Sequence, residues 1–245
     1  MTESCTVVTG AASGIGFAVA SKLLSLGESI AAVDLNSGRL QDRFHDNADV
    51  CQIACDLTTS DGFHSLTTEI KRCFPAGVKG FVHAAGIDSV APIGMLSAEA
   101  MQKLYSIHAV FPVLFLGWMS KKANHVPEAA GVLISSLSTH EGAKGHVAYA
   151  AAKGGVEGAL KPAAAELLGK GIRLNAVVLG VVETEMSQGW LKKLSPEQFA
   201  ALKCDYPLGL GKPEAVADVI AFLLSSGAQW IAGQTIVCDG GHGLV

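Results

Sequence analysis

A glycine-rich turn between a strand and a helix constrains this chain most. Residues 5–9 form a short β-branched run typical of a buried strand, and an apolar helix is expected from residue 17 to about residue 26. Glycines between them let the backbone turn and approach a pyrophosphate, which would face the helix N-terminus. The spacing G-x-x-x-G-x-G therefore predicts a dinucleotide site formed by Gly10, Ser13, Gly14, Ile15 and Gly16.

Two acidic residues follow the next two expected strands. Residues 29–33 form a strand ending in Asp34, about 20 residues past the glycine turn, where a carboxylate accepts hydrogen bonds from a ribose diol and repels a 2′-phosphate. Asp34 could also cap a helix beginning near Ser37. Residues 50–54 form a strand followed by Asp56 and Leu57, both assigned to the cofactor site. Asp56 either contacts the adenine ring or caps the helix that starts near Ser60, and the sequence leaves both open.

The remaining pattern alternates strands with helices of ten or more residues. Further strands are expected at residues 78–82, 132–135, 172–178 and 235–238, and helices at 98–122, 147–168 and 213–225. Such alternation predicts an α/β fold, a Rossmann-like doubly wound parallel sheet of about seven strands with helices on both faces. We expect a single domain over residues 1–245. Pro162 should bend the helix at 147–168 or disturb one of its turns.

Residues 184–211 interrupt this rhythm. Apolar side chains, among them Met186 and Trp190, lie there in a polar background. The segment suits a mobile lid over a substrate, or equally a small surface helix packed on the core.

A serine, a tyrosine and a lysine form the candidate catalytic group. Ser136 closes an apolar run, so it is expected at the C-terminal end of a strand, where open α/β sheets bind ligands. Tyr149 and Lys153 are one helical turn apart and share a face. An adjacent ammonium lowers the pKa of a phenol from about 10, and such a phenol can exchange a proton with a substrate oxygen. By itself the pattern Y-x-x-x-K recurs by chance on ordinary amphipathic helices.

Composition excludes several other classes of protein. A formal charge of −4 gives no reason to expect nucleic-acid binding, and 49% hydrophobic with 16% charged residues argues against disorder. No apolar segment approaches the roughly 20 residues that span a membrane, and the start leaves no room for a signal peptide. We therefore expect a soluble cytoplasmic protein without a metal site. Reduced thiols are expected at all six cysteines, Cys5, Cys51, Cys55, Cys73, Cys204 and Cys238.

Together these motifs resemble the short-chain dehydrogenase/reductase family over nearly the whole chain. The family's T-G-x-x-x-G-x-G turn matches residues 9–16, and its catalytic Ser, Tyr and Lys match Ser136, Tyr149 and Lys153. Its N-A-G segment appears as residues 84–86, with His83 near the usual Asn, and Asp239-Gly240-Gly241 matches its common ending. The resemblance adds these residues to the cofactor site: Ala84, Ala85, Gly86, Tyr149, Lys153, Gly180, Val182 and Thr184.

The resemblance implies hydride exchange between NAD(H) and a small carbonyl or secondary-alcohol substrate. Tyr149 would be the general acid or base, Ser136 would bind the substrate oxygen, and Lys153 would lower the pKa of Tyr149 and bind the nicotinamide ribose. Among members, the sequence resembles the 3-oxoacyl-(acyl carrier protein) reductases and related hydroxyacyl or secondary-alcohol dehydrogenases, so a carrier-bound acyl chain is a candidate substrate. Basic residues at the mouth would then be Lys121, Lys122 and Lys170. A homotetramer or homodimer is also implied.

Departures from the family and two rival functions remain. His108 stands where the family has an Asn whose backbone carbonyl holds a water of the proton relay, and an imidazole would add a group titrating near pH 6.5. His108 could instead merely pack against its helix. His83 and Leu179 replace an Asn and a Pro. The rivals to an enzyme are a non-catalytic dinucleotide sensor and a structural subunit of an oligomer.

Overall fold

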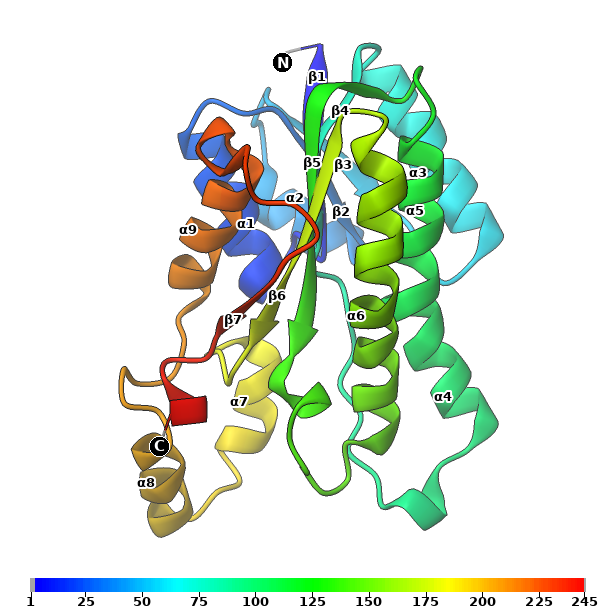
Figure 1. The fold of residues 1–245 in the computed structure, drawn as a ribbon. Coiled ribbons are helices and arrows are strands. Elements are labelled where there is room, and N and C mark those ends of the chain that lie inside the picture. The colour runs from blue at the N-terminus through cyan, green and yellow to red at the C-terminus, as the bar shows by residue number, and fades with distance from the viewer. Residues whose placement is uncertain (1–2, 245) are drawn as a thin grey trace.

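The computed structural model describes residues 3–244 and is built on one parallel sheet (Figure 1). The strand order is β3-β2-β1-β4-β5-β6-β7. The order reverses between β1 and β4, and in such sheets ligands bind in the crevice beyond the strand C-termini at that point. This confirms the predicted fold class. The strands are β1 (Ser4–Thr9), β2 (Ile30–Asp34), β3 (Val50–Ala54), β4 (Gly77–His83), β5 (His125–Ser136), β6 (Ile172–Leu179) and β7 (Thr235–Cys238).

Helices cover both faces of the sheet. Helices α1, α2 and α9 lie on one face and α3, α5 and α6 on the other (Figure 1). Two smaller helices, α7 and α8, lie beyond the C-terminal ends of the strands. The helices are α1 (Gly14–Ser25), α2 (Ser37–Phe44), α3 (Ser60–Cys73), α4 (Ala98–Tyr105), α5 (Phe111–Met119), α6 (Val147–Leu168), α7 (Glu185–Leu191), α8 (Pro196–Cys204) and α9 (Pro213–Leu224).

The central strands are buried on both faces, which explains their nearly continuous apolar sequences. Neighbouring residues on a strand point to opposite faces, so Val7 joins the core beneath α3, α5 and α6, and Val8 joins the core beneath α1 and α9. On β4, Phe81 likewise joins the core beneath α3, α5 and α6, and Val82 joins the core beneath α1 and α9. No helix in residues 3–244 is long and apolar enough to cross a membrane.

The helix expected over residues 98–122 is broken. A π-helical turn, Ser106–Val110, separates α4 from α5. Pro112 has no backbone N–H, so the carbonyl of His108 lacks its usual α-helical donor. The turn is instead closed by a wider bond from the Phe111 N–H to the Ser106 carbonyl. In α6, by contrast, the helix continues from Val147 to Leu168 without a break at Pro162.

The prediction of reduced thiols is wrong for one pair of cysteines. Cys51 on β3 and Cys73 at the end of α3 form a disulfide, with their Cα atoms 6.6 Å apart. Their separation of 22 residues carries no pairing signal, because the contact arises only when α3 packs back against the sheet edge. The other four cysteines are free: Cys5, Cys55, Cys204 and Cys238.

Candidate functional site

A cavity of about 450 Å³ lies at the C-terminal ends of the strands, beside the point where the strand order reverses. It gathers residues from eight separate stretches of the chain, which explains why no single motif outlines it. Most of the residues assigned to a cofactor line it, namely Gly10, Ser13, Gly14, Ile15, Gly16, Asp34, Asp56, Leu57, Ala84, Ala85, Gly86, Tyr149, Lys153 and Thr184.

The glycine turn has no room for side chains at two positions. Gly10 has φ +67°, and a Cβ there would lie 2.9 Å from backbone atoms of Ala85. A Cβ on Gly16 would overlap the carbonyl oxygen of Gly10. Ser13, the N-cap of α1, makes no capping bond with its side chain. The turn therefore presents a helix N-terminus and an unused hydroxyl at the cavity, an arrangement that suits a phosphate group.

Asp34 ties the end of β2 to the glycine turn. Its carboxylate accepts hydrogen bonds from the backbone N–H groups of Ala12 and Asn36, both at 3.1 Å. Asn36, and not Asp34, caps α2, because its side chain accepts the Arg39 N–H. The capping alternative for Asp34 is therefore wrong, and its carboxylate lines the cavity.

Asp56 is also not a helix cap. Its carboxylate accepts bonds from the backbone N–H and hydroxyl of Thr58, at 2.9 and 2.6 Å. Thr59 caps α3 by accepting the Gly62 N–H. These hydrogen bonds lower the pKa of Asp56. An ionised Asp56 therefore lines the cavity next to Leu57.

Ser136, Tyr149 and Lys153 come together as the sequence predicted. Ser136 ends β5, and Tyr149 and Lys153 lie in the first two turns of α6. The Lys153 ammonium donates a 2.8 Å hydrogen bond to the Ile134 carbonyl and lies 5.8 Å from the centroid of the Tyr149 ring. The Ser136 hydroxyl hydrogen-bonds the phenol. Tyr149 and Lys153 thus line this cavity, and the Ser136 hydroxyl lies beside the phenol.

The expected lowering of the pKa of Tyr149 is wrong for this structure. Burial raises its pKa well above the usual value, the Asp88 carboxylate adds to the rise, and only the bond from Ser136 opposes it. Burial also lowers the pKa of Lys153 to about 8, so its ammonium is mostly charged at pH 7. Tyr149 is therefore a protonated phenol at neutral pH, the form that a general acid needs.

Thr9 and His83 form a buried network that the sequence analysis missed. Nε2–H of His83 donates to the Ile107 carbonyl at 2.8 Å, so its Nδ1 accepts from the Thr9 hydroxyl at 2.9 Å. The same hydroxyl accepts the backbone N–H groups of Ala84 and Ala85 at 3.1 Å. Burial lowers the pKa of His83 to about 3 and keeps it neutral. The network holds residues 84–85 against the glycine turn, and its signal in the sequence was a polar residue ending each of two adjacent buried strands.

His108 lies in the cavity wall as a neutral imidazole. Its Nε2–H donates to the Ile87 carbonyl at 2.8 Å, and its ring meets the Tyr149 ring edge-on at 5.3 Å. It packs over Gly86, where a Cβ would overlap the imidazole. Burial, and next the charge of Lys153, lower its pKa to about 3. The expectation of a group titrating near pH 6.5 is therefore wrong, because a buried imidazole beside an ammonium resists protonation.

His108→Asn should consequently leave the pH–rate profile unchanged and alter acid stability. Unfolded His108 takes up a proton below about pH 6.5 whereas folded His108 does not until about pH 3, so wild-type stability falls as the pH drops through this window. Between pH 7.5 and 5 the variant should lose about 2 kcal/mol less free energy of unfolding than wild type. Urea titrations at both pH values measure this. Equal losses, or a shifted acidic limb of the rate profile, would contradict the neutral assignment.

A second cavity of about 430 Å³, here called the substrate cavity, adjoins the first at Tyr149. Gly180 and Val182, assigned to the cofactor, line this cavity and not the first one. Met186 and Trp190 of α7 form part of its wall. Sequence reasoning gave no signal for its polar lining, because these residues come from loops without a motif: Asp88, Ser138, Glu141 and His146.

The basic residues expected around the mouth lie elsewhere. Lys121 and Lys122 follow α5 and Lys170 follows α6, at the opposite end of the sheet from Ser136 (Figure 1). The regular part of β5, eight residues long in its pairing with β6, puts roughly 25 Å between that end and the site. Lys170 is held there by a bond to the Ser120 hydroxyl. They cannot receive a carrier protein at the entrance.

The chain is similar to known oxidoreductases over almost its full length. Residues 10–243 match the family described as enoyl-(acyl carrier protein) reductase. D-Threitol dehydrogenase of Mycolicibacterium smegmatis is 32% identical, with 96% of this chain and 91% of that protein covered. A 3-oxoacyl-[acyl-carrier-protein] reductase of Vibrio cholerae is 30% identical, with 98% and 97% covered.

Solved structures agree with these relatives. 4-Hydroxyisoleucine dehydrogenase complexed with NADH superposes with a TM-score of 0.89 at 25% identity, covering 99% of both chains. An NADPH-bound short-chain oxidoreductase of Pseudomonas aeruginosa superposes with a TM-score of 0.85 at 26% identity, covering 97% of this chain and 95% of that one. A nicotinamide dinucleotide is thus the cofactor class of these neighbours. This chain belongs to the short-chain dehydrogenase/reductase family of oxidoreductases.

Proposed function

We propose that the protein is an NAD(H)-dependent oxidoreductase that interconverts a carbonyl compound and a secondary alcohol. One observation carries the proposal. Tyr149, with Ser136 and Lys153 beside it, stands at the junction of the two cavities, so a substrate oxygen in one would lie next to a cofactor in the other. The relatives support two substrate classes, 3-oxoacyl compounds and polyols.

Each residue of the group has a separate task in the reaction. In reduction Tyr149 gives its phenolic proton to the substrate oxygen, and in oxidation the phenolate takes it back. The Ser136 hydroxyl donates a hydrogen bond to that oxygen as charge develops on it. A bound nicotinamide supplies or accepts the hydride and, when oxidised, brings a positive charge that favours the phenolate. Lys153 adds a second positive charge, held in place by the Ile134 carbonyl.

The glycine turn, Asp34 and Lys153 would hold the cofactor. The pyrophosphate would lie on the N-terminus of α1, the adenosine ribose at Asp34, and the nicotinamide ribose at Lys153. Asp56 and Leu57 would flank the adenine, and Thr184, the N-cap of α7, would lie near the nicotinamide. We propose one domain for residues 1–245, with residues 184–211 closing over the substrate.

NAD(H) should be preferred over NADP(H) by roughly 100-fold in kcat/KM, because a 2′-phosphate would meet the Asp34 carboxylate and like charges at close range cost several kcal/mol. Asp34→Ser should reduce the preference to within about tenfold by removing that charge. The matched control is Asp42→Ser on the exposed surface of α2, which should keep the wild-type preference. Kinetics with both cofactors decide the matter. A wild-type enzyme that works better with NADPH would refute this assignment.

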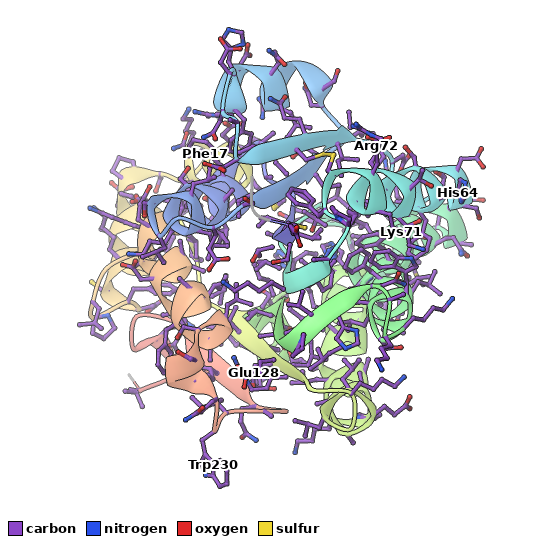
Figure 2. All side chains as sticks on the ribbon, turned by 90° about the horizontal axis from the view of Figure 1, so that it is seen from above. Phe17, His64, Lys71, Arg72, Glu128 and Trp230 are labelled. Carbon is purple, nitrogen blue, oxygen red and sulfur yellow. A yellow bond between two sulfur atoms is a disulfide. The ribbon has the colours of Figure 1, made fainter. Side chains whose placement is uncertain are left out.

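A homotetramer or homodimer is also proposed. Apolar side chains are exposed on α5 and at the end of α6, among them Leu114 and Leu168. Near the β7 edge of the sheet Trp230 is 97% exposed and projects away from the fold (Figure 2). A second copy of the chain covering these surfaces would remove them from water. Light scattering at micromolar concentration tests this, and a monomer would contradict it.

A substrate screen tests the proposed reaction against its two rivals. The purified chain with NADH should turn over at least one member of a panel of ketones, sugars, steroids and acyl thioesters, followed by NADH absorbance. Tight NADH binding without any turnover would favour a cofactor sensor. Turnover only after a partner subunit is added would favour a structural role.

A further inference from the structure

We infer that the substrate cavity takes a small, neutral, polyhydroxylated alcohol or the matching hydroxyketone, and rejects compounds with an anionic group beside the reacting carbon. The inference rests on the proposed reaction and names its substrate class. It is carried by the charge, the open hydrogen-bond acceptors and the mixed polar and apolar lining of this cavity.

The charge of the cavity is negative. Asp88 and Glu141 line it, and its lining contains no Lys or Arg. Both residues are exposed at the cavity, and their charges reach its tyrosines: after burial, Asp88 adds to the raised pKa of Tyr149, and Glu141 to that of Tyr206. Within residues 3–244 neither carboxylate pairs with a Lys or an Arg. A carboxylate, phosphate or sulfonate on the substrate would therefore meet like charge that no Lys or Arg of the lining offsets.

The two carboxylates are held by fixed partners that leave acceptors open. Oδ1 of Asp88 accepts the Ser89 N–H at 2.8 Å. Oε1 of Glu141 pairs with Nε2 of His242 at 2.9 Å, and the His242 ring stacks on Tyr206 with centroids 4.6 Å apart. In the described part of the chain, Asp88 Oδ2 and Glu141 Oε2 have no hydrogen-bond partner. Carboxylate oxygens of this kind accept bonds from the hydroxyls of a diol.

The cavity lining contains further polar groups. Ser138 and His146 line it, and the His146 ring is 6.3 Å from that of Tyr149. Ser138 Oγ and His146 Nδ1 are buried and have no partner among residues 3–244. Leaving such atoms unpaired costs free energy, so a ligand whose hydroxyls or bridging waters reach them gains more than a purely apolar ligand.

Apolar side chains also line the cavity, among them Val181, Met186 and Trp190. Such side chains pack against C–H groups, while hydroxyls of the same molecule can meet the carboxylates. A polyol has both features. A volume of about 430 Å³ suits a small ligand, and the lysines that would dock a carrier protein lie at the other end of the sheet.

A matched four-carbon series tests the inference with NAD⁺ in excess. The compounds are butane-2,3-diol, butan-2-ol, which lacks the second hydroxyl, and 3-hydroxybutyrate, which carries a carboxylate. We expect kcat/KM for the diol to exceed that for butan-2-ol by about tenfold and that for 3-hydroxybutyrate by about 100-fold. Asp88→Asn and Glu141→Gln should each reduce the preference for diol over 3-hydroxybutyrate by about tenfold. Glu166→Gln, on the exposed surface of α6, is the matched control and should change neither ratio.

The outcomes separate this inference from the proposed reaction. If 3-hydroxybutyrate or butan-2-ol is oxidised best, or if both cavity variants keep the wild-type ratios, the substrate class is wrong while the reaction stands. If none of the three four-carbon compounds is oxidised but another ketone or alcohol turns over, the substrate class is again wrong and the proposed reaction stands. If no alcohol or ketone turns over although NADH binds, the proposed reaction itself fails.

Discussion

Tyr149→Phe is expected to lower kcat by about 10²–10⁴-fold or more, because it removes the transferable proton and little else. The Phe ring keeps the edge-on contact with His108 and the position above Lys153. NADH affinity should therefore change by less than about threefold, which is under 1 kcal/mol. Steady-state kinetics and NADH fluorescence titration measure the two quantities.

Tyr105→Phe is the matched control for this loss. Tyr105 ends α4, packs near Gly155 and lines neither cavity. It should retain nearly full activity. A Tyr149→Phe enzyme with a near-wild-type kcat would remove Tyr149 from proton transfer and leave the site without a general acid.

Gly16→Ala should cost both stability and cofactor affinity. The added Cβ would overlap the Gly10 carbonyl oxygen, and backbone at that point has no flexible end that can move aside. We expect a loss of roughly 3 kcal/mol in the free energy of unfolding. Because about 1 kcal/mol moves Tm by about 2–4 °C in a chain of this size, Tm should fall by about 6–12 °C. NADH binding should weaken by at least about 100-fold, because the turn must open where a pyrophosphate would lie.

The matched control is Gly154→Ala. Gly154 lies inside α6, and a Cβ there would meet no atom within 4 Å. Ala has the higher helix propensity, so Tm should stay equal or rise slightly. Unchanged Tm and unchanged NADH affinity in Gly16→Ala would show that the turn tolerates a side chain and is not built for a cofactor.

The sequence predicted the features that depend on local spacing. The glycine turn depends only on residues adjacent in the sequence, and the pairing of Tyr149 with Lys153 depends only on a spacing of one helical turn. Both features could therefore be predicted from the sequence. The order of strands and helices gave the sheet in the same way. Asp34 was expected at the end of its strand and was found there, although Asn36 proved to be the cap of α2.

The features that were missed depend on contacts between distant segments. The pKa of Tyr149 is raised by burial and by Asp88, which is 61 residues away in the sequence, and not lowered by the neighbouring Lys153. The pairing of Cys51 with Cys73 needs α3 to fold back on the sheet edge. Glu141 meets His242 only because the C-terminal segment lies beside the loop that precedes α6. None of these pairings leaves a periodic or short-range signal.

Transfer of a labelled hydride tests the central claim most directly. The purified chain would be mixed with NADH carrying deuterium on one face of nicotinamide C4 and with a small hydroxyketone such as 3-hydroxybutan-2-one, and the alcohol product analysed by mass spectrometry. With NADH labelled on the face that the enzyme uses, we expect one deuterium on the carbinol carbon, and Tyr149→Phe should form this product at least about 100-fold more slowly. Alcohol product without deuterium from either labelled face, or equal rates of transfer in wild type and variant, would contradict this claim.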